Sequence, residues 1–203
     1  MPRVLNIIRD EHRSIAAVLH GMQYLVQHIG ERGVSIDPKV FRAMIYYLDT
    51  FSERVHHPKE DHFLFAALRR RGRTADPVIH ELEQEHQAGA QELRLLEQSL
   101  VRYEEGGPRE FLAFSETVER FAQHYWSHMR KEEEQVFPLA ERLLTAADWQ
   151  AIDRAFEENR DPLAPEQEEK DFQKLFSRIV NLAPPPIGFG PEARPRSPVR
   201  AAG

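Results

Sequence analysis

Two histidine–glutamate pairs carry the residue types that hold transition-metal ions in proteins. His56 is followed four residues later by Glu60, and His128 is followed by Glu132 at the same spacing. On an α-helix, residues four apart lie on one face, one turn from each other. Each pair can therefore direct a nitrogen and a carboxylate at one point and supply half of a metal site.

Two further histidines stand in a second repeated phrase. His12 lies in EHRSIAAVL at 11–19, and His86 lies in EHQAGAQEL at 85–93. If the four segments are helices of one bundle, four imidazoles and two carboxylates meet at its centre. Facing carboxylates can bridge two ions while imidazoles cap each one. Such a site suits iron, manganese or zinc better than calcium or magnesium, which prefer oxygen ligands.

The chain has no cysteine, which excludes disulfides, thiolate zinc sites, iron–sulfur clusters and cysteine nucleophiles. An ionised carboxylate in an apolar interior is costly unless it is paired or coordinated, and a bound dication removes that cost. Metal binding also needs neutral histidines, so we expect affinity to weaken as the pH falls through the histidine pKa, about 6.5 when unperturbed.

The pairing in the first histidine–glutamate segment has an alternative, because His57 and Asp61 are also four residues apart. Aligning LF at 64–65 with VF at 136–137 sets Glu60 against Glu132 and His56 against His128, and we favour that alignment. His57, Asp61 and His124, one turn before His128, stay open as additional ligands or as residues that contact the ligands.

The elements that must position these residues are helices, because apolar residues recur at helical spacing and no convincing alternating strand pattern is present. We predict a helix over about 2–30, ended by the glycines at 30 and 33. Further helices are predicted from Asp37-Pro38, where Asp37 can cap the free amides, to about 71, from Asp76-Pro77 onward, and after EEGGPREF at 104–111. Four long helices with short connections predict an all-α, up-down-up-down four-helix bundle, and the repeats make it two copies of one helical hairpin.

Two prolines, Pro58 and Pro138, fall inside predicted helices. Proline removes a backbone hydrogen bond and clashes with the preceding turn. We therefore expect a kink or bulge beside the histidines at 56 and 57. The alternative is that this helix breaks near His57 into two.

The chain after the bundle, which we place at residues 1–144, divides into two parts. Residues 145–181 form a helical extension, with one helix in TAADWQAIDRAFEENRD, capped by Thr145 or Asp148, and a second in PEQEEKDFQKLFSRIV. Residues 182–203 are rich in proline and glycine, and we expect this tail to be disordered or loosely docked.

The net charge of −6 gives no electrostatic case for a nucleic-acid or anionic-membrane partner. No stretch approaches the roughly 20 apolar residues that span a bilayer, and the N-terminal residues lack the apolar core of a signal peptide. We expect a cytoplasmic protein.

The order His, His-x-x-x-Glu, His, His-x-x-x-Glu, with EDHFLF at 60–65 and EEEQVFP at 132–138, resembles the hemerythrin-like, or HHE cation-binding, domain over about residues 1–144. The resemblance implies a non-haem di-iron centre, oxo- or hydroxo-bridged, in a four-helix bundle. It implies that the two glutamates bridge the ions. The implied ligands are His12, His56, Glu60, His86, His128 and Glu132.

One departure bears on function. Oxygen-carrying hemerythrins place two histidines one turn apart on the third helix, whereas here Leu82 and Ala90 flank His86. The chain is similar instead to members with four histidines and two glutamates, which are linked to sensing, nitric oxide response or iron delivery. We expect a protein that binds dioxygen, nitric oxide or peroxide for sensing, iron handling or stress response.

Two other functions stay open. The same centre would act as an enzyme on peroxide or nitric oxide if an external electron donor served it, since the sequence shows no reductase domain, nucleotide loop or separate catalytic base. We favour a binding protein over an enzyme. The third reading is a helical interaction module whose C-terminal segment recruits a protein partner.

Overall fold

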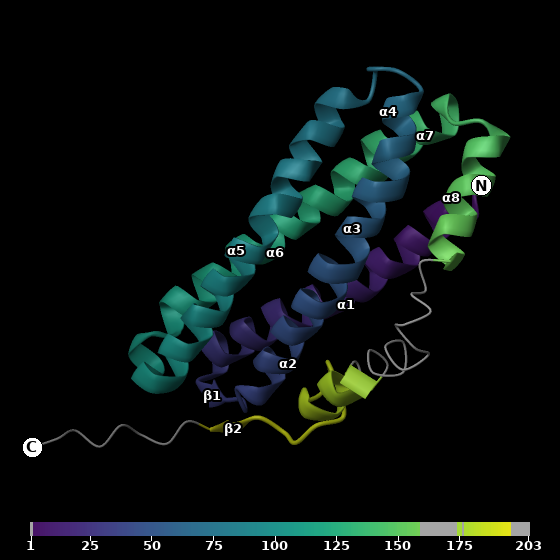
Figure 1. The fold of residues 1–203 in the computed structure, drawn as a ribbon. Coiled ribbons are helices and arrows are strands. Elements are labelled where there is room, and N and C mark those ends of the chain that lie inside the picture. The colour runs from purple at the N-terminus through teal and green to yellow at the C-terminus, as the bar shows by residue number, and fades with distance from the viewer. Residues whose placement is uncertain (1, 159–173, 176, 196–203) are drawn as a thin grey trace, which may run out of the picture.

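The structure is a computed structural model that describes residues 2–158, 174–175 and 177–195. This part of the chain is mostly helical, which confirms the all-α class (Figure 1). Four long helical stretches run through it. They are α1 (Arg3–Arg32); the continuous run of α2 (Lys39–Tyr47), η1 (Leu48–His56), α3 (His57–Lys59), η2 (Glu60–Phe65) and α4 (Ala66–Arg70); α5 (Asp76–Gly106); and α6 (Phe111–Lys131) with η4 (Glu132–Val136) and α7 (Phe137–Leu143).

Two residues, Gly33 and Asp37, shape the turn between the first two stretches. Gly33 ends α1 in the left-handed conformation, with φ 59°, and its N–H donates to the Ile29 carbonyl at 3.1 Å. Gly30, expected as a second terminator, lies inside α1. Asp37 Oδ1 accepts the Lys39 N–H at 3.0 Å, which confirms the predicted cap. The short 3-10 turn η3 (Gly107–Arg109) similarly joins α5 to α6.

Wide π-helical turns occur at both interior prolines. Pro58 lies in α3, between the π-helical segments η1 and η2. Pro138 is the second residue of α7, which begins directly after the π-helical segment η4. A π-turn accommodates the missing N–H and the bulk of the ring without ending the helix. The expected bulge is confirmed. The predicted alternative of a break near His57 is wrong, because His56 and His57 keep helical dihedrals.

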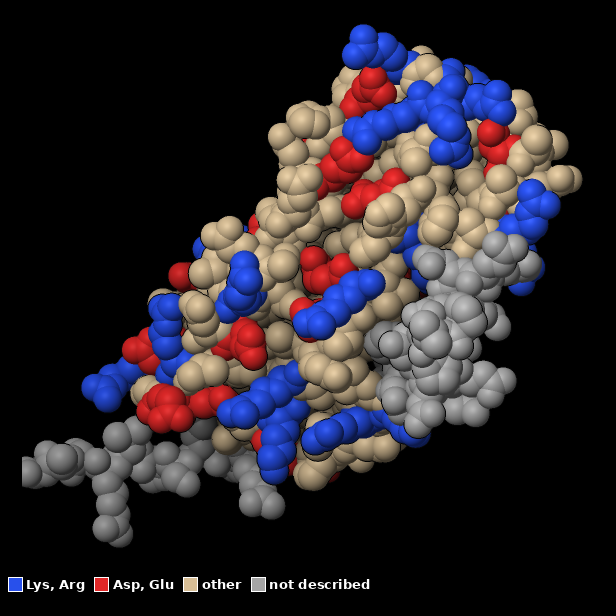
Figure 2. All heavy atoms as spheres, in the orientation of Figure 1, with Lys and Arg blue, Asp and Glu red and all other residues tan. Residues whose placement is uncertain are grey.

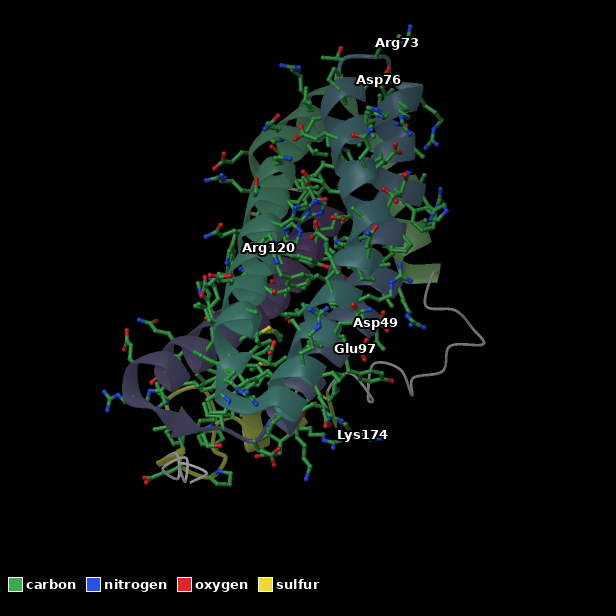
Figure 3. The ribbon with its side chains drawn as sticks, turned by 90° about the vertical axis from the view of Figure 1, so that its left-hand side faces the viewer. Asp49, Arg73, Asp76, Glu97, Arg120 and Lys174 are labelled. Carbon is green, nitrogen blue, oxygen red and sulfur yellow. The ribbon has the colours of Figure 1, made fainter. Side chains whose placement is uncertain are left out.

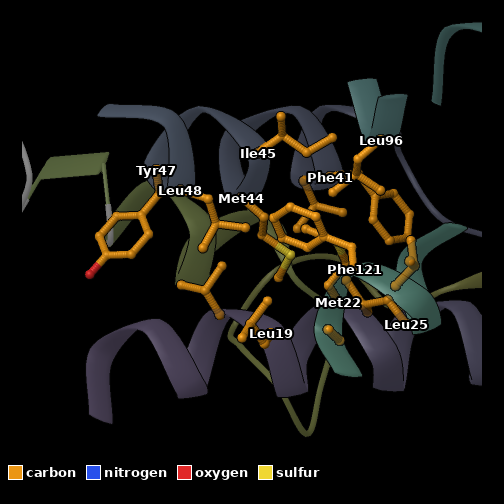
Figure 4. Close-up of a cluster of buried hydrophobic side chains, with 14 of the residues drawn as sticks. Leu19, Met22, Leu25, Phe41, Met44, Ile45, Tyr47, Leu48, Leu96 and Phe121 are labelled. Carbon is orange, nitrogen blue, oxygen red and sulfur yellow. The ribbon is translucent and has the colours of Figure 1, made fainter. Parts of the chain in front are cut away.

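The apolar stripes of the helices build two buried clusters. α5 packs against α6, α6 against α1, and α2 and η1 against both α1 and α5. The larger cluster includes Leu19, Met22, Phe41, Met44, Leu96 and Phe121 (Figure 4). The second includes Leu5, Ile8, Phe65, Leu82 and Phe137. His12 lies on α1 between Ile8 of the second cluster and Ile15 of the larger one, so this histidine lies between the two apolar clusters.

The segment after residue 144 packs back on the bundle. Asp148 and Thr145 hydrogen-bond each other reciprocally at the start of α8 (Ala146–Glu158), which contacts α1 and η2. Of the second predicted C-terminal helix, residues 174–175 and 177–182 are described and helical. Its earlier residues, like 196–203 of the predicted tail, lie outside the described residues. The boundaries at 144 and 181 stay predictions.

A two-residue strand pair lies near the C-terminal end. β1 (Val34–Ser35) pairs antiparallel with β2 (Arg194–Pro195), which brings the end of the described chain beside the turn after α1 (Figure 1). Just before it, Ala183 is buried in the larger cluster, against which Ile187 also packs.

Both signs of charge are interspersed on the face shown in Figure 2. In Figure 3, Arg73 and Asp76 mark the turn between α4 and α5, and Arg120 lies along α6. Nitrogen- and oxygen-bearing side chains also enter the space between the helices in that view. Among the described residues, no helix is long and apolar enough to cross a membrane.

Candidate metal centre

The six side chains singled out from the sequence meet in the interior. They come from all four helical stretches, and each is buried: His12 in α1, His56 at the end of η1, Glu60 at the start of η2, His86 in α5, His128 in α6 and Glu132 at the start of η4. Helical periodicity explains the placement, since His12 continues the apolar stripe of α1 and His86 and His128 continue those of α5 and α6.

The Nε2 atoms of the four histidines converge on the two carboxylates. His12 Nε2 lies 3.1 Å from Glu132 Oε2 and 4.0 Å from Glu60 Oε1. His56 Nε2 lies 3.6 Å from Glu60 Oε2, and His128 Nε2 lies 3.5 Å from Glu132 Oε1. His86 Nε2 is 3.8 Å from Glu60 Oε2 and 3.9 Å from Glu132 Oε1. Both carboxylates therefore lie between opposing histidines.

These donors divide into two overlapping groups. The first donor group is His12, His56, Glu60 and Glu132, and the second donor group is Glu60, His86, His128 and Glu132. Within each group the donor atoms lie within 4.8 Å of one another. Because both glutamates belong to both groups, the geometry fits two ions that share two carboxylates.

Most of the donor atoms are buried and lack hydrogen bonds. All four oxygens of Glu60 and Glu132, with Nε2 of His12 and of His56, have no hydrogen-bond partner among the described residues. His12 Nε2 and Glu132 Oε2 are at ion-pair distance but are not aligned for a hydrogen bond. Buried polar atoms are nearly always satisfied in proteins, so this concentration of orphaned donors indicates an absent ligand.

The opposite ring nitrogen of every one of these histidines meets a carboxylate at 2.8 Å. Nδ1 of His12 faces Glu133, that of His56 faces Glu11, that of His86 faces Asp61 and that of His128 faces Glu85. We call Glu11, Asp61, Glu85 and Glu133 the outer carboxylates. An Nδ1–H that donates to a carboxylate leaves the Nε2 lone pair for a metal and fixes the ring, as is usual for metal-binding histidines.

The outer carboxylates form a closed cycle through the fold. A carboxylate on each of the first three helical stretches contacts the histidine Nδ1 of the following stretch, and a carboxylate on the fourth stretch contacts the histidine Nδ1 of the first. Sequence reasoning missed the roles of Glu11, Glu85 and Glu133. The signal was present, because every outer carboxylate is the chain neighbour of a predicted ligand: Glu11 precedes His12, and Asp61 follows Glu60.

His86 and His128 show why a cation fits. Their Nε2 atoms are 3.1 Å apart, and both Nδ1 atoms face carboxylates. If the proton of each ring is on Nδ1, the lone pairs of the two Nε2 atoms face each other and neither nitrogen can donate a hydrogen bond. Two nitrogens bound about 2.1 Å from one ion at right angles would lie about 3 Å apart, which matches this spacing.

The electrostatics of the metal-free cluster point the same way. Burial lowers the pKa of His12, but the carboxylate of Glu132 at ion-pair distance and the hydrogen-bonded carboxylate of Glu133 outweigh it and raise that pKa to about 9. Burial and the neighbouring Glu132 raise the pKa of Glu60 well above its ordinary value. The pKa of Glu132 lies well below its ordinary value, because His128 and His12 outweigh the effect of burial. Protons thus partly occupy the place of a cation.

The residues left open by the sequence go to three different places. Asp61 is about one-third exposed and contacts His86 Nδ1, so Glu60 rather than Asp61 lies between the donor groups. His124 is about one-third exposed and 3.7 Å from Glu92, outside both groups. His57 is buried beside His86 and His128, with which it forms a third donor cluster, and burial lowers its pKa to about 3.

Comparison with known proteins was made at three levels. The family model described as the hemerythrin HHE cation binding domain matches residues 3–140. No curated protein and no solved structure matches the chain.

Proposed function

Because this chain belongs to the hemerythrin HHE cation-binding domain family, we propose that its buried cluster holds two iron ions and binds dioxygen, nitric oxide or peroxide. The role is sensing, iron handling or stress response, and manganese or zinc are the other metals that the donors suit. The proposed ligands are His12, His56, Glu60, His86, His128 and Glu132.

One observation supports this proposal above the others: two buried glutamates whose four oxygens lack hydrogen bonds, among histidines that all turn Nε2 toward them. Such carboxylates destabilise an apolar interior unless a cation compensates them. Bound iron would supply the affinity for diatomic molecules and the redox chemistry that protein side chains lack.

The protein's own contribution is orientation and exclusion of water. The outer carboxylates hold the imidazole rings, and the two apolar clusters close the site from both ends. Phe137 stacks on the His12 ring with centroids 6.2 Å apart, and Phe51 stacks on His56 at 6.4 Å. An apolar surround favours a small uncharged ligand over a charged metabolite.

The architecture is part of the proposal. We assign the four helical stretches to an up-down-up-down bundle of two hairpin repeats at residues 1–144, followed by an extension at 145–181 and a tail at 182–203. The repeated EH and H-x-x-x-E phrases support this assignment. A cytoplasmic location also stays a proposal, consistent with the absence of cysteine.

The proposal is tested by anaerobic reconstitution with ferrous iron, followed by metal analysis and absorption spectra before and after nitric oxide or oxygen. We expect about two irons per chain and an iron-dependent band that changes with the gas. The Glu60→Ala and Glu132→Ala variants should lose both, and Glu92→Ala, beside His124, serves as the matched control. Folded protein that takes up no iron after reconstitution contradicts the proposal.

A further inference from the structure

A fifth histidine lies in the same interior and has no part in the six-ligand set. His57 follows His56 in the chain and is 5% exposed. Its ring stacks on that of His86, with centroids 4.2 Å apart and planes 11° apart, and lies 5.1 Å from the ring of His128. One donor atom from each of these three residues lies within 4.8 Å of the others.

His57 also has a carboxylate beside its Nδ1 atom. That nitrogen lies 3.5 Å from Glu53 Oε1, one turn earlier on η1, at ion-pair distance. The Nδ1 atoms of the four proposed histidine ligands are hydrogen-bonded to their carboxylates at 2.8 Å, whereas His57 Nδ1 has no hydrogen-bond partner among the described residues. A carboxylate on Nδ1 leaves Nε2 as the nitrogen available to a metal.

The carboxylate that supports His57 is itself held from two other helices. Tyr125 on α6 donates its hydroxyl to Glu53 Oε1. On α5, Gly89 makes room, since a Cβ at that position would lie 2.4 Å from Glu53 Oε2. Glycine in the middle of a helix costs about 0.5–1 kcal/mol relative to alanine, so the close approach explains its presence there. Tyr125 therefore holds the Glu53 carboxylate next to His57, in the space that Gly89 leaves open.

The arrangement favours one donor group over the other. His57 clusters with His86 and His128, which belong to the second donor group, and not with His12. The geometry points to His57 as a fifth nitrogen ligand, serving the metal ion of the second donor group. This inference rests on the proposed function.

The consequence is an unequal pair of metal positions. The second donor group then offers three imidazoles and two carboxylates, and the first offers two imidazoles and two carboxylates. An ion beside His12 and His56 would be held by fewer protein ligands, so it would be bound more weakly and would leave more room for a small ligand.

The test uses Co²⁺ as the probe in the full chain. In proton NMR of a high-spin cobalt protein, each ligated imidazole gives one strongly shifted N–H signal that disappears in D₂O. We expect five such signals in the wild type, four in His57→Gln and five in the control His124→Gln. Four signals in the wild type with two ions bound overturn the assignment of His57 and leave the two-metal site intact. A chain that binds no cobalt overturns the two-metal function as well.

A second measurement separates ligation from packing. In cobalt titrations against a chelator, His57→Gln should weaken one of the two ions by about tenfold or more and change the other little. Glu53→Gln keeps the contact to Tyr125 and should weaken the same ion less. Equal affinities in the wild type and His57→Gln contradict the inference. The signal count in the wild type needs no variant, so it decides the question even if His57→Gln fails to fold.

Discussion

Replacing Glu60 by methionine should raise the stability of the metal-free protein while abolishing its response to metal. The Glu60 side chain is 1% exposed, and neither of its oxygens has a hydrogen-bond partner among the described residues. Burial and the neighbouring Glu132 raise its pKa well above the ordinary value, which favours the neutral carboxyl in the metal-free protein, and its buried oxygens stay unsatisfied. Methionine has a similar length and fills the same space without those atoms.

The magnitude follows from that environment. An unsatisfied buried polar group costs about 1–3 kcal/mol, and its removal should return that amount to the free energy of unfolding. For a chain of 203 residues each kcal/mol corresponds to about 2–4 °C in the melting temperature, so we expect a rise of roughly 2–12 °C. Wild-type protein should gain about 2.7 kcal/mol per site when free metal is one hundred times Kd, and Glu60→Met should gain almost none.

Glu132→Met is the matched contrast, because Glu132 is ionised and lies 3.1 Å from His12 Nε2. Its removal leaves the buried His12 with Glu133 as its remaining hydrogen-bonded carboxylate partner, which should destabilise the metal-free protein by up to about 3–5 kcal/mol. Thermal unfolding with chelator and with ferrous iron measures both variants. The reasoning is refuted if Glu60→Met melts below the wild type without metal, or if it keeps the stabilisation by iron.

Three further predictions follow from the contacts around the site. Glu85→Gln, which weakens the partner of His128 Nδ1, should lower metal affinity about 10–100-fold in a chelator competition, whereas Glu92→Gln should not change it. The pKa of His12 is raised to about 9, so the stability that this charge contributes to the metal-free protein is complete below about pH 6.5 and is lost as the pH rises through about 9. Urea unfolding at about pH 6.5 and about pH 9.5 should show this loss. A His12→Gln variant that shows the same loss would contradict the prediction. Gly89→Ala should destabilise the protein by about 1–3 kcal/mol, because the added Cβ meets the Glu53 carboxylate. Gly30→Ala should be neutral or slightly stabilising, because its Cβ would lie 3.5 Å from Phe111. Equal melting temperatures for the two variants would contradict the prediction.

The sequence was sufficient to predict what depends on spacing along one helix. The i, i+4 pair at His128 and Glu132 and the apolar stripe containing His12 both follow from 3.6 residues per turn. Aligning the repeats favoured Glu60 over Asp61, which was available at the same spacing, and in the structure Glu60 belongs to both donor groups.

What the sequence could not predict depends on rotation and contact between helices. Glu11 and Glu133 look like solvated acids in the chain, and only the packing of α1 against its neighbours brings them to His56 and His12. His57 and His124 were equal candidates by sequence. The π-helical turns beside Pro58 place His57 in the interior, while His124 lies on a partly exposed face of α6.

The most direct test of the central claim is anomalous diffraction at the iron edge from crystals of the iron-loaded protein. The account predicts two anomalous peaks inside the helices, both adjacent to Glu60 and Glu132, one beside His12 and His56 and the other beside His86 and His128. Iron found only on the surface, or a loaded crystal with no peak between the two glutamates, would contradict it.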